Sequence, residues 1–199
     1  MSKLRLNLGL VALSAIWLMA AAANAAGEEG KVAGEGGYGG PYGIGRTAAP
    51  AEIAAWDIDV RPDGAGLPSG QGTAARGEGV YQTNCVACHG SNLQGVRGTR
   101  GGPLVGGRGS LASKWPLKTV ESFWPYATTL YDFVNRAMPF DKPGSLSPGE
   151  VYAVVAYILH RAKIIDAEEE MNAHTLPRVR MPNRDGFFPD DRPDVFDYN

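Results

Sequence analysis

Apolar residues recur at the spacing of an α-helix in three stretches of the chain, which predicts three helices. The first, over 74–84, has one face formed by Gly77, Val80 and Tyr81. The last begins with Ser147 as the cap, Pro148 in the first turn and Glu150 completing a capping box. Its apolar stripe keeps the 3.6-residue period without a gap and is formed by Val151, Val154, Val155, Ile158 and Leu159.

The middle helix is predicted to deliver a side chain from its end. Its core face is formed by Leu130, Phe133, Val134 and Ala137. Thr129 can cap its start, with Asp132 in the capping-box position. Pro139 disfavours helical geometry at the residue before it, so we expect the helix to stop at Met138.

The rest of the chain is rich in helix breakers. Residues 26–48 hold nine glycines, and 49–72 continue with proline and glycine, which indicates an extended wrap over a domain that begins near Thr73. A glycine-rich loop is expected over 90–109. The predicted fold class is therefore all-α, with irregular arms at both ends.

The first 25 residues are typical of a secretory signal peptide. Lys3 and Arg5 precede an apolar run, and residues 23–25 supply a small-x-small cleavage site. The alternative is a retained anchor, but the run falls short of the ~20 residues that a membrane-spanning helix needs. We expect a periplasmic protein without a membrane span in its mature chain.

Composition and charge narrow the possible partners. The 199 residues are 44% apolar and 20% charged, as in globular proteins, and the formal charge of −2 argues against a nucleic-acid partner. No acidic residue occurs between Glu78 and Glu121, whereas this stretch contains Arg97, Arg100, Arg108, Lys114 and Lys118. Because this basic stretch contrasts with an acidic tail over 166–199, the charge of the chain is unevenly distributed, which favours electrostatic steering of an oppositely charged partner.

The two cysteines carry the strongest chemical signal. Cys85 and Cys88 precede His89 in a C-x-x-C-H motif, the signature of covalent haem c attachment, in which the histidine coordinates iron. A thioredoxin-like pair would need βαβ surroundings, and zinc would need a second ligand pair. The sequence contains a single motif, which predicts one haem.

The second axial ligand decides between electron transfer and ligand chemistry. The candidates that remain after signal removal are His160, His174, Met138, Met171 and Met181. Met138 is the best placed because its helix is expected to end there, and Met181 is the second choice. The alternative reading is that Met138 only fills space in the core.

These residues together resemble class I c-type cytochromes over about 73–163. The resemblance implies three to five helices around one haem, with Gly77 and Tyr81 of the first helix meeting Tyr157 of the last. It also implies that the carbonyl of Pro103 accepts a hydrogen bond from His89 Nδ1.

A narrower resemblance reaches outside the haem domain. The stretches IAAWDIDVRPDG at 53–64, WPYATT at 124–129 and MPNRDGF at 181–187 are similar to the cytochrome subunit of the Sox sulfane dehydrogenase. This resemblance implies a partner subunit that carries a molybdenum cofactor and oxidises a reduced sulfur compound. A related sulfite dehydrogenase cytochrome fits almost as well, and better-known members carry two haem domains where this chain has one.

We therefore expect a signal peptide (1–25), an N-terminal arm (26–72), a monohaem domain (73–165) and an acidic C-terminal tail (166–199). The domain would pass electrons from the molybdenum subunit to a downstream acceptor cytochrome, without bond chemistry of its own. The alternatives are a freestanding electron shuttle and a haem enzyme or sensor with an open sixth site. The arms either dock the partner or fold back on the haem domain.

Overall fold

The computed structural model describes residues 44–189, so the expected signal peptide lies outside the described residues. The chain divides into two units, 1–52 and 53–199. In the first unit, Arg46 and Glu52 form an exposed ion pair. Helix α1 (Pro50–Trp56) was not expected, and it begins with a proline, whose fixed φ suits a first turn.

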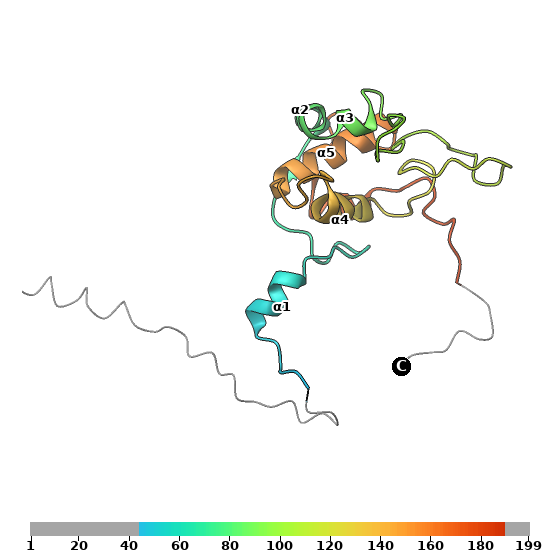
Figure 1. The fold of residues 1–199 in the computed structure, drawn as a ribbon. Coiled ribbons are helices and arrows are strands. Elements are labelled where there is room, and N and C mark those ends of the chain that lie inside the picture. The colour runs from blue at the N-terminus through green and yellow to red at the C-terminus, as the bar shows by residue number, and fades with distance from the viewer. Residues whose placement is uncertain (1–43, 190–199) are drawn as a thin grey trace, which may run out of the picture. The chain divides into compact units, whose positions relative to one another are not determined.

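The second unit is mainly helical, as the sequence predicts (Figure 1). Its helices are α2 (Ala74–Asn84), α3 (Val86–His89), α4 (Ala127–Ala137), α5 (Pro148–Arg161) and the 3₁₀ turn η1 (Leu176–Arg178). Two short strands, β1 (Gln71–Gly72) and β2 (Met171–Asn172), pair antiparallel. Among residues 44–189, no helix combines the length and apolar character needed to cross a membrane.

Helices α2 and α5 cross at close range, which confirms the predicted contact at Gly77. A Cβ atom added to Gly77 would lie 1.8 Å from the carbonyl oxygen of Ala153 and 2.8 Å from Cβ of Tyr157. One turn further along α2, the ring centroids of Tyr81 and Tyr157 are 5.2 Å apart. Only glycine permits the two backbones to approach this closely.

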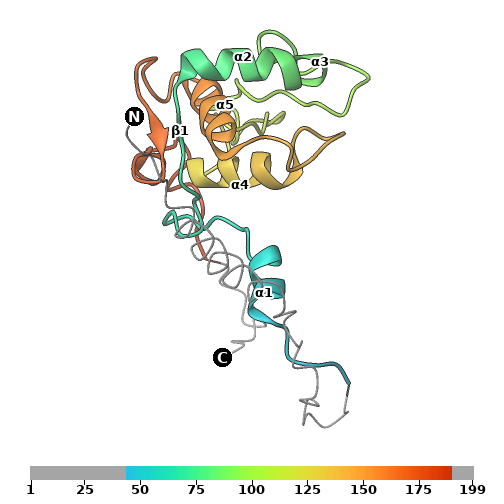
Figure 2. The ribbon, with the colours of Figure 1, turned by 90° about the vertical axis from the view of Figure 1, so that its left-hand side faces the viewer.

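Helix α5 forms the centre of the unit. Figure 2 shows it between α2 and α4. Its capping box forms as predicted, and the Glu150 carboxylate accepts a 2.8 Å hydrogen bond from the Ser147 backbone N–H. Every residue from 151 to 159 is buried, more than the predicted stripe, because neighbouring elements cover the helix on several sides.

Helix α4 ends where the sequence predicts and begins earlier. It ends at Ala137, and Met138 is extended with φ −126° and ψ 149°. The predicted cap at Thr129 is wrong, because the helix begins at Ala127 and the cap position is Tyr126, three residues before Thr129. Asp132 instead holds an incoming segment, since its Oδ1 accepts a 2.9 Å hydrogen bond from the Val60 backbone N–H.

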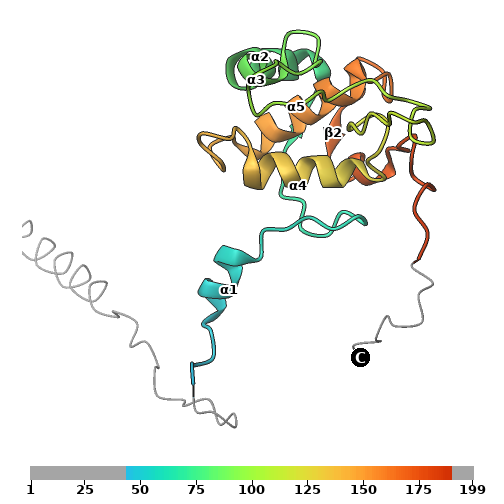
Figure 3. The same cartoon turned by 45° about the vertical axis from the view of Figure 1, so that its right-hand side comes forward.

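Within the second unit, segments of both arms pack on the helices: residues 60–72 from the N-terminal side and residues 171–183 from the C-terminal side (Figure 3). Val60, Met171, Leu176 and Met181 are buried in the same core as the helices. The hydroxyl of Tyr152 donates a 2.9 Å hydrogen bond to the carbonyl of Pro68. For these residues the structure agrees with the fold-back alternative, whereas two arm aromatics are highly exposed: Trp56 (87%) and Phe188 (89%).

Candidate functional site

A cavity of about 680 Å³ lies among α3, α4 and α5. Its apolar wall includes Leu130 and Val134 of α4 and Val154 and Ile158 of α5. The sequence predicted these four side chains as core-facing, and the structure places them at the edge of the core, where they also line a cavity. The volume is in the range of protein pockets for small molecules and cofactors, roughly 300–1,000 Å³.

The C-x-x-C-H motif forms one turn of helix at the cavity wall. Helix α2 ends before Cys85, whose carbonyl accepts hydrogen bonds from the backbone N–H groups of Cys88 (3.1 Å) and His89 (2.9 Å). Cys85, Cys88 and His89 all line the cavity. Burial raises the pKa of the Cys85 thiol to about 11, with a smaller contribution from Cys88. This position favours an uncharged sulfur, such as a thiol or a thioether.

The imidazole of His89 is oriented by the loop that follows the motif. Its Nδ1 lies 2.8 Å from the carbonyl oxygen of Gly102. A carbonyl only accepts, so Nδ1 carries the proton, and in the neutral ring Nε2 keeps a lone pair available to a metal. The resemblance to class I cytochromes implied the carbonyl of Pro103 as the acceptor; this is wrong, because the acceptor is the carbonyl of Gly102.

Gly101 explains the shift by one residue. A Cβ atom at Gly101 would lie 2.2 Å from the carbonyl oxygen of Cys88, so the loop and the motif meet backbone to backbone. The next carbonyl, that of Gly102, is then the one within reach of the imidazole. Pro103 is not among the residues that line the cavity, although its neighbour Leu104 is.

Met138 lines the same cavity as His89. It follows the last residue of α4, and its extended backbone directs the chain away from the helix axis. The cavity therefore brings together two thiols, an imidazole and a thioether, contributed by residues 85–89 and by the residue that follows α4.

The other candidate ligands lie elsewhere. Met171 and Met181 are each 1% exposed and belong to the core cluster. His160 is half-buried near the end of α5, and His174 is exposed. None of these four lines the cavity.

Charged and aromatic residues after α3 and after α4 also line the cavity, and of these the sequence analysis named only Arg100, as one of the basic residues between Glu78 and Glu121. The guanidinium carbon of Arg100 lies 4.5 Å from the centroid of the exposed Phe140 ring. Asp141 and Lys142 follow Phe140 in the lining. Phe140 could have been suspected from its place two residues after Met138, but no local pattern marks Arg100 as its partner.

The residues present fit a covalently attached haem. The donor chemistry is complete, because thiols can form thioethers and the imidazole and thioether are common axial ligands of haem iron. The apolar wall suits a macrocycle, and the hydrogen bond to Gly102 fixes the tautomer that binds metal.

Comparisons with known proteins agree with this site. A protein-family model described as cytochrome c matches residues 74–162. The crystal structure of the sulfane dehydrogenase SoxCD from Paracoccus pantotrophus contains a chain that is 40% identical. The match covers 78% of this chain and 75% of that chain, with a TM-score of 0.70. A search of curated proteins found no match.

Proposed function

The chain belongs to the cytochrome c family, and on that premise we propose that it is the haem-bearing electron-transfer subunit of a molybdenum-containing dehydrogenase that oxidises a reduced sulfur compound, a sulfane or a sulfite. One observation carries this proposal. The similarity to the SoxCD chain covers 78% of this chain and so extends well beyond residues 74–162, which the cytochrome c model matches. A generic electron shuttle would need to share only the haem domain.

Haem c, which this family binds covalently, supplies a one-electron iron couple. In the proposal, Cys85 and Cys88 would hold it covalently, and His89 and Met138 would bind its iron. Gly102 holds the His89 ring in the metal-binding tautomer through the 2.8 Å hydrogen bond. The apolar side chains of α4 and α5 exclude water, and with a methionine ligand this favours a high reduction potential.

The proposed location is the periplasm. Two features of the sequence support it: the first 25 residues have the pattern of a secretory signal peptide, and the C-x-x-C-H motif is the signature of covalent haem attachment. A downstream cytochrome would receive the electrons. No bond to the sulfur compound is made or broken by this chain in the proposal, because His89 and Met138 together leave iron no open position.

The test is co-expression of this chain with its dehydrogenase subunit, followed by purification, metal analysis and optical spectra. We expect iron and molybdenum to elute together, and the haem spectrum to become reduced when sulfite or a sulfane donor is added. Elution without molybdenum, or a haem that the dehydrogenase does not reduce, would favour a freestanding shuttle. Binding of carbon monoxide to the reduced protein would instead favour a haem enzyme or sensor.

A further inference from the structure

Residues 107–118 form a closed loop whose ends are bound to each other. The hydroxyl of Ser110 donates to the carbonyl of Gly107 (2.6 Å) and accepts from the backbone N–H of Leu117 (3.0 Å). A Cβ atom at Gly107 would lie 2.3 Å from the carbonyl oxygen of Leu117, so the two ends are in contact. This is the construction of a compact Ω-like loop.

The loop is also tied to the body of the unit. Arg108 forms a 3.0 Å ion pair with Glu121 and donates a 2.9 Å hydrogen bond to the carbonyl of Ala162 at the end of α5. Glu121 accepts a further 2.6 Å hydrogen bond from the backbone N–H of Gly106. The loop is therefore preorganised, and little ordering cost remains for a partner that binds it.

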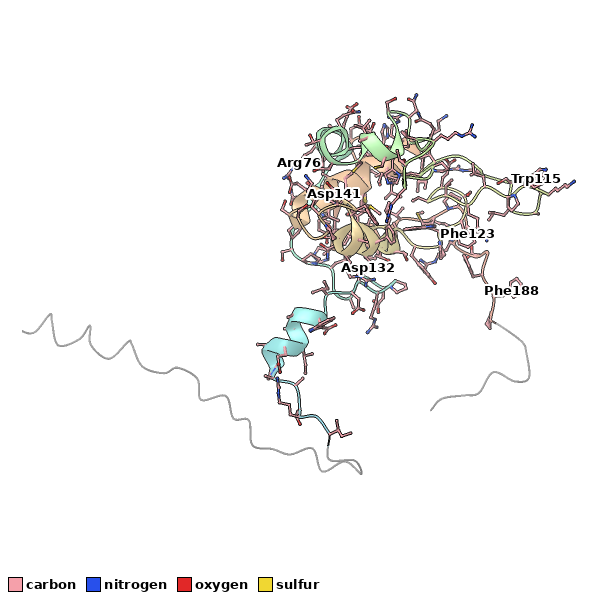
Figure 4. All side chains as sticks on the ribbon, in the orientation of Figure 1. Arg76, Trp115, Phe123, Asp132, Asp141 and Phe188 are labelled. Carbon is pink, nitrogen blue, oxygen red and sulfur yellow. The ribbon has the colours of Figure 1, made fainter. Side chains whose placement is uncertain are left out.

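At the outer end of this loop the indole of Trp115 is exposed to solvent. Trp115 is 79% exposed, and Figure 4 shows it far from the helices. Its only aromatic or cationic neighbour among the described residues is Lys114, whose Nζ lies 5.4 Å from the ring centroid. An exposed tryptophan beside a lysine, on a loop whose ends are fixed, has the composition of an interface hot spot.

The charge of the loop indicates the sign of the partner. Arg108 is neutralised by Glu121, whereas Lys114 and Lys118 form no ion pair among the described residues, although Lys118 Nζ lies 4.9 Å from the centroid of the Phe123 ring. The sequence contains no acidic residue between Glu78 and Glu121. The matching surface is therefore acidic, with an apolar pocket for the indole.

The loop is connected at both ends to the wall of the cavity proposed to hold the haem. The chain leaves the cavity wall at Leu104 and returns to it at Val120, while no residue of 107–118 lines the cavity. Both ends of the loop therefore join the cavity wall within a few residues, so a protein seated on the loop would be coupled to that wall through Leu104 and Val120.

We propose that the 107–118 loop is the docking surface for an acidic one-electron acceptor protein. This inference rests on the proposed electron-transfer function. A chain with one C-x-x-C-H motif holds one electron, so it must meet an acceptor between the two electrons of each sulfur oxidation. Each encounter passes one electron to the acceptor, and no bond or proton moves.

The size of the surface favours a transient acceptor over the permanent subunit. Electron-transfer encounters are small and rely on charge steering, whereas stable subunits bury a large, apolar area. One loop with a single exposed indole and two lysines that no carboxylate neutralises among the described residues matches the first description. A lipid surface is disfavoured, because lipid-binding segments generally cluster four to eight basic residues.

The experiment uses the full-length haem-loaded protein and, as the probe, an acidic blue-copper protein. Stopped-flow oxidation of the reduced protein gives the second-order rate constant, and calorimetric titration of the two oxidised proteins gives the affinity without electron transfer. The test variants are Trp115→Ala and Lys114→Glu. The matched controls are Trp56→Ala, which removes a similarly exposed indole, and Lys163→Glu, which makes the same charge change outside the loop, next to the Ala162 carbonyl that Arg108 binds.

We expect the test variants to lower both the rate constant and the affinity about tenfold or more, and Lys114→Glu to weaken the salt dependence. The controls should stay within about twofold, and oxidation by a neutral quinone should be unchanged in all variants. Unchanged rates in Trp115→Ala, or equal losses in the controls, would overturn the proposal. So would Trp115-dependent sedimentation with phosphatidylserine vesicles. Reduction by the dehydrogenase is a separate assay, so its failure would count against the proposed function and not against the docking surface.

Discussion

At the scale of single residues, Met138 combines two constraints that sequence and structure impose independently. Pro139 ends the helix, and the extended backbone at Met138 then carries its thioether into the lining of the cavity that also contains His89. A methionine that only filled the core would not need to face the same cavity as a free imidazole nitrogen.

We predict that Met138→Ala removes the methionine-to-ferric-iron charge-transfer band in the optical spectrum. The reduction potential should fall by on the order of 0.1 V or more, because axial ligands set haem potentials over a range of about 0.8 V. Optical spectroscopy and a potentiometric titration measure the two effects.

Met181→Ala is the matched control for this prediction, because Met181 is buried in the core and does not line the cavity. It should destabilise the fold and leave the band in place. Survival of the band in Met138→Ala, together with its loss in Met181→Ala, would show that the ligand has been assigned to the wrong methionine.

The sequence alone could predict the types of residue at the site but not every contact. The spacing of the motif identifies Cys85, Cys88 and His89, because covalent haem attachment requires two cysteines three positions apart with a histidine directly after the second. The spacing of residues does not identify the carbonyl that accepts the hydrogen bond from His89 Nδ1. Its identity, Gly102 and not Pro103, depends on how closely Gly101 approaches Cys88, and that is a property of tertiary packing.

At the scale of secondary-structure elements, the crossing of α2 and α5 depends on Gly77. We predict that Gly77→Ala lowers the free energy of unfolding by about 3 kcal/mol or more, because the new Cβ would meet the Ala153 carbonyl at 1.8 Å. Backbone atoms cannot rotate away, so the helices must separate. Thermal unfolding followed by circular dichroism should show a fall in Tm of roughly 6–12 °C.

Gly79 supplies the control on the same helix. A Cβ atom there would have no heavy atom within 4 Å, so Gly79→Ala should stabilise the protein by about 0.5–1 kcal/mol through helix propensity alone. If Gly77→Ala were as stable as Gly79→Ala, the close crossing would be wrong.

A second prediction at this scale concerns the attachment of the N-terminal segment to α4. The side chain of Asp132 is only 13% exposed, and its Oδ1 accepts hydrogen bonds from the Val60 N–H and from Arg136 Nε, both at 2.9 Å. Asp132→Ala should cost about 1–3 kcal/mol, because it leaves these donors without their acceptor. Hydrogen exchange should show lost protection at the Val60 amide.

Asp63→Ala is the control: Asp63 lies in the segment that contains Val60, where its exposed carboxylate pairs with Arg61 and accepts a 3.0 Å hydrogen bond from the Ala65 N–H. Its cost should stay below about 1 kcal/mol, with Val60 still protected. Equal effects of the two substitutions would mean that Asp132 is an ordinary surface charge.

Helix boundaries were predictable where local chemistry decides them. The capping box of Ser147 and Glu150 and the stop before Pro139 both act within a few residues, and both form as predicted. Thr129 had the right spacing from Asp132 to cap a helix, but Asp132 is engaged by Val60, a residue 72 positions away in the sequence. A long-range partner of this kind leaves no trace in a local pattern.

At the scale of the whole molecule, the compact unit extends beyond residue 165, where the sequence predicted the end of the haem domain. The tail was expected to begin at residue 166, yet Met171, Leu176 and Met181 are buried beside the helices. Near its end, Asn183 donates a 2.7 Å hydrogen bond to the carbonyl of Phe123, and Phe187 packs edge-on against the Phe123 ring at 5.2 Å. These contacts make the described part of the tail structural.

We therefore predict opposite outcomes for two truncations. A chain ending at Ile165 loses three buried side chains worth about 1.5–3 kcal/mol each, a loss comparable to the total stability of about 5–15 kcal/mol of a typical domain. It should unfold or melt far below the intact protein. A chain ending at Pro189 keeps all three and should retain its Tm within a few degrees. Thermal unfolding of the haem-loaded proteins, followed in the haem absorption band, measures both effects. An unchanged Tm in the shorter chain would contradict the structural role.

The same result decides how docking by the tail must be tested. Loss of partner binding by the chain that ends at Ile165 would report unfolding and not the loss of a docking surface. Phe188→Ala is the suitable variant, because this side chain is 89% exposed and its removal leaves the core unchanged.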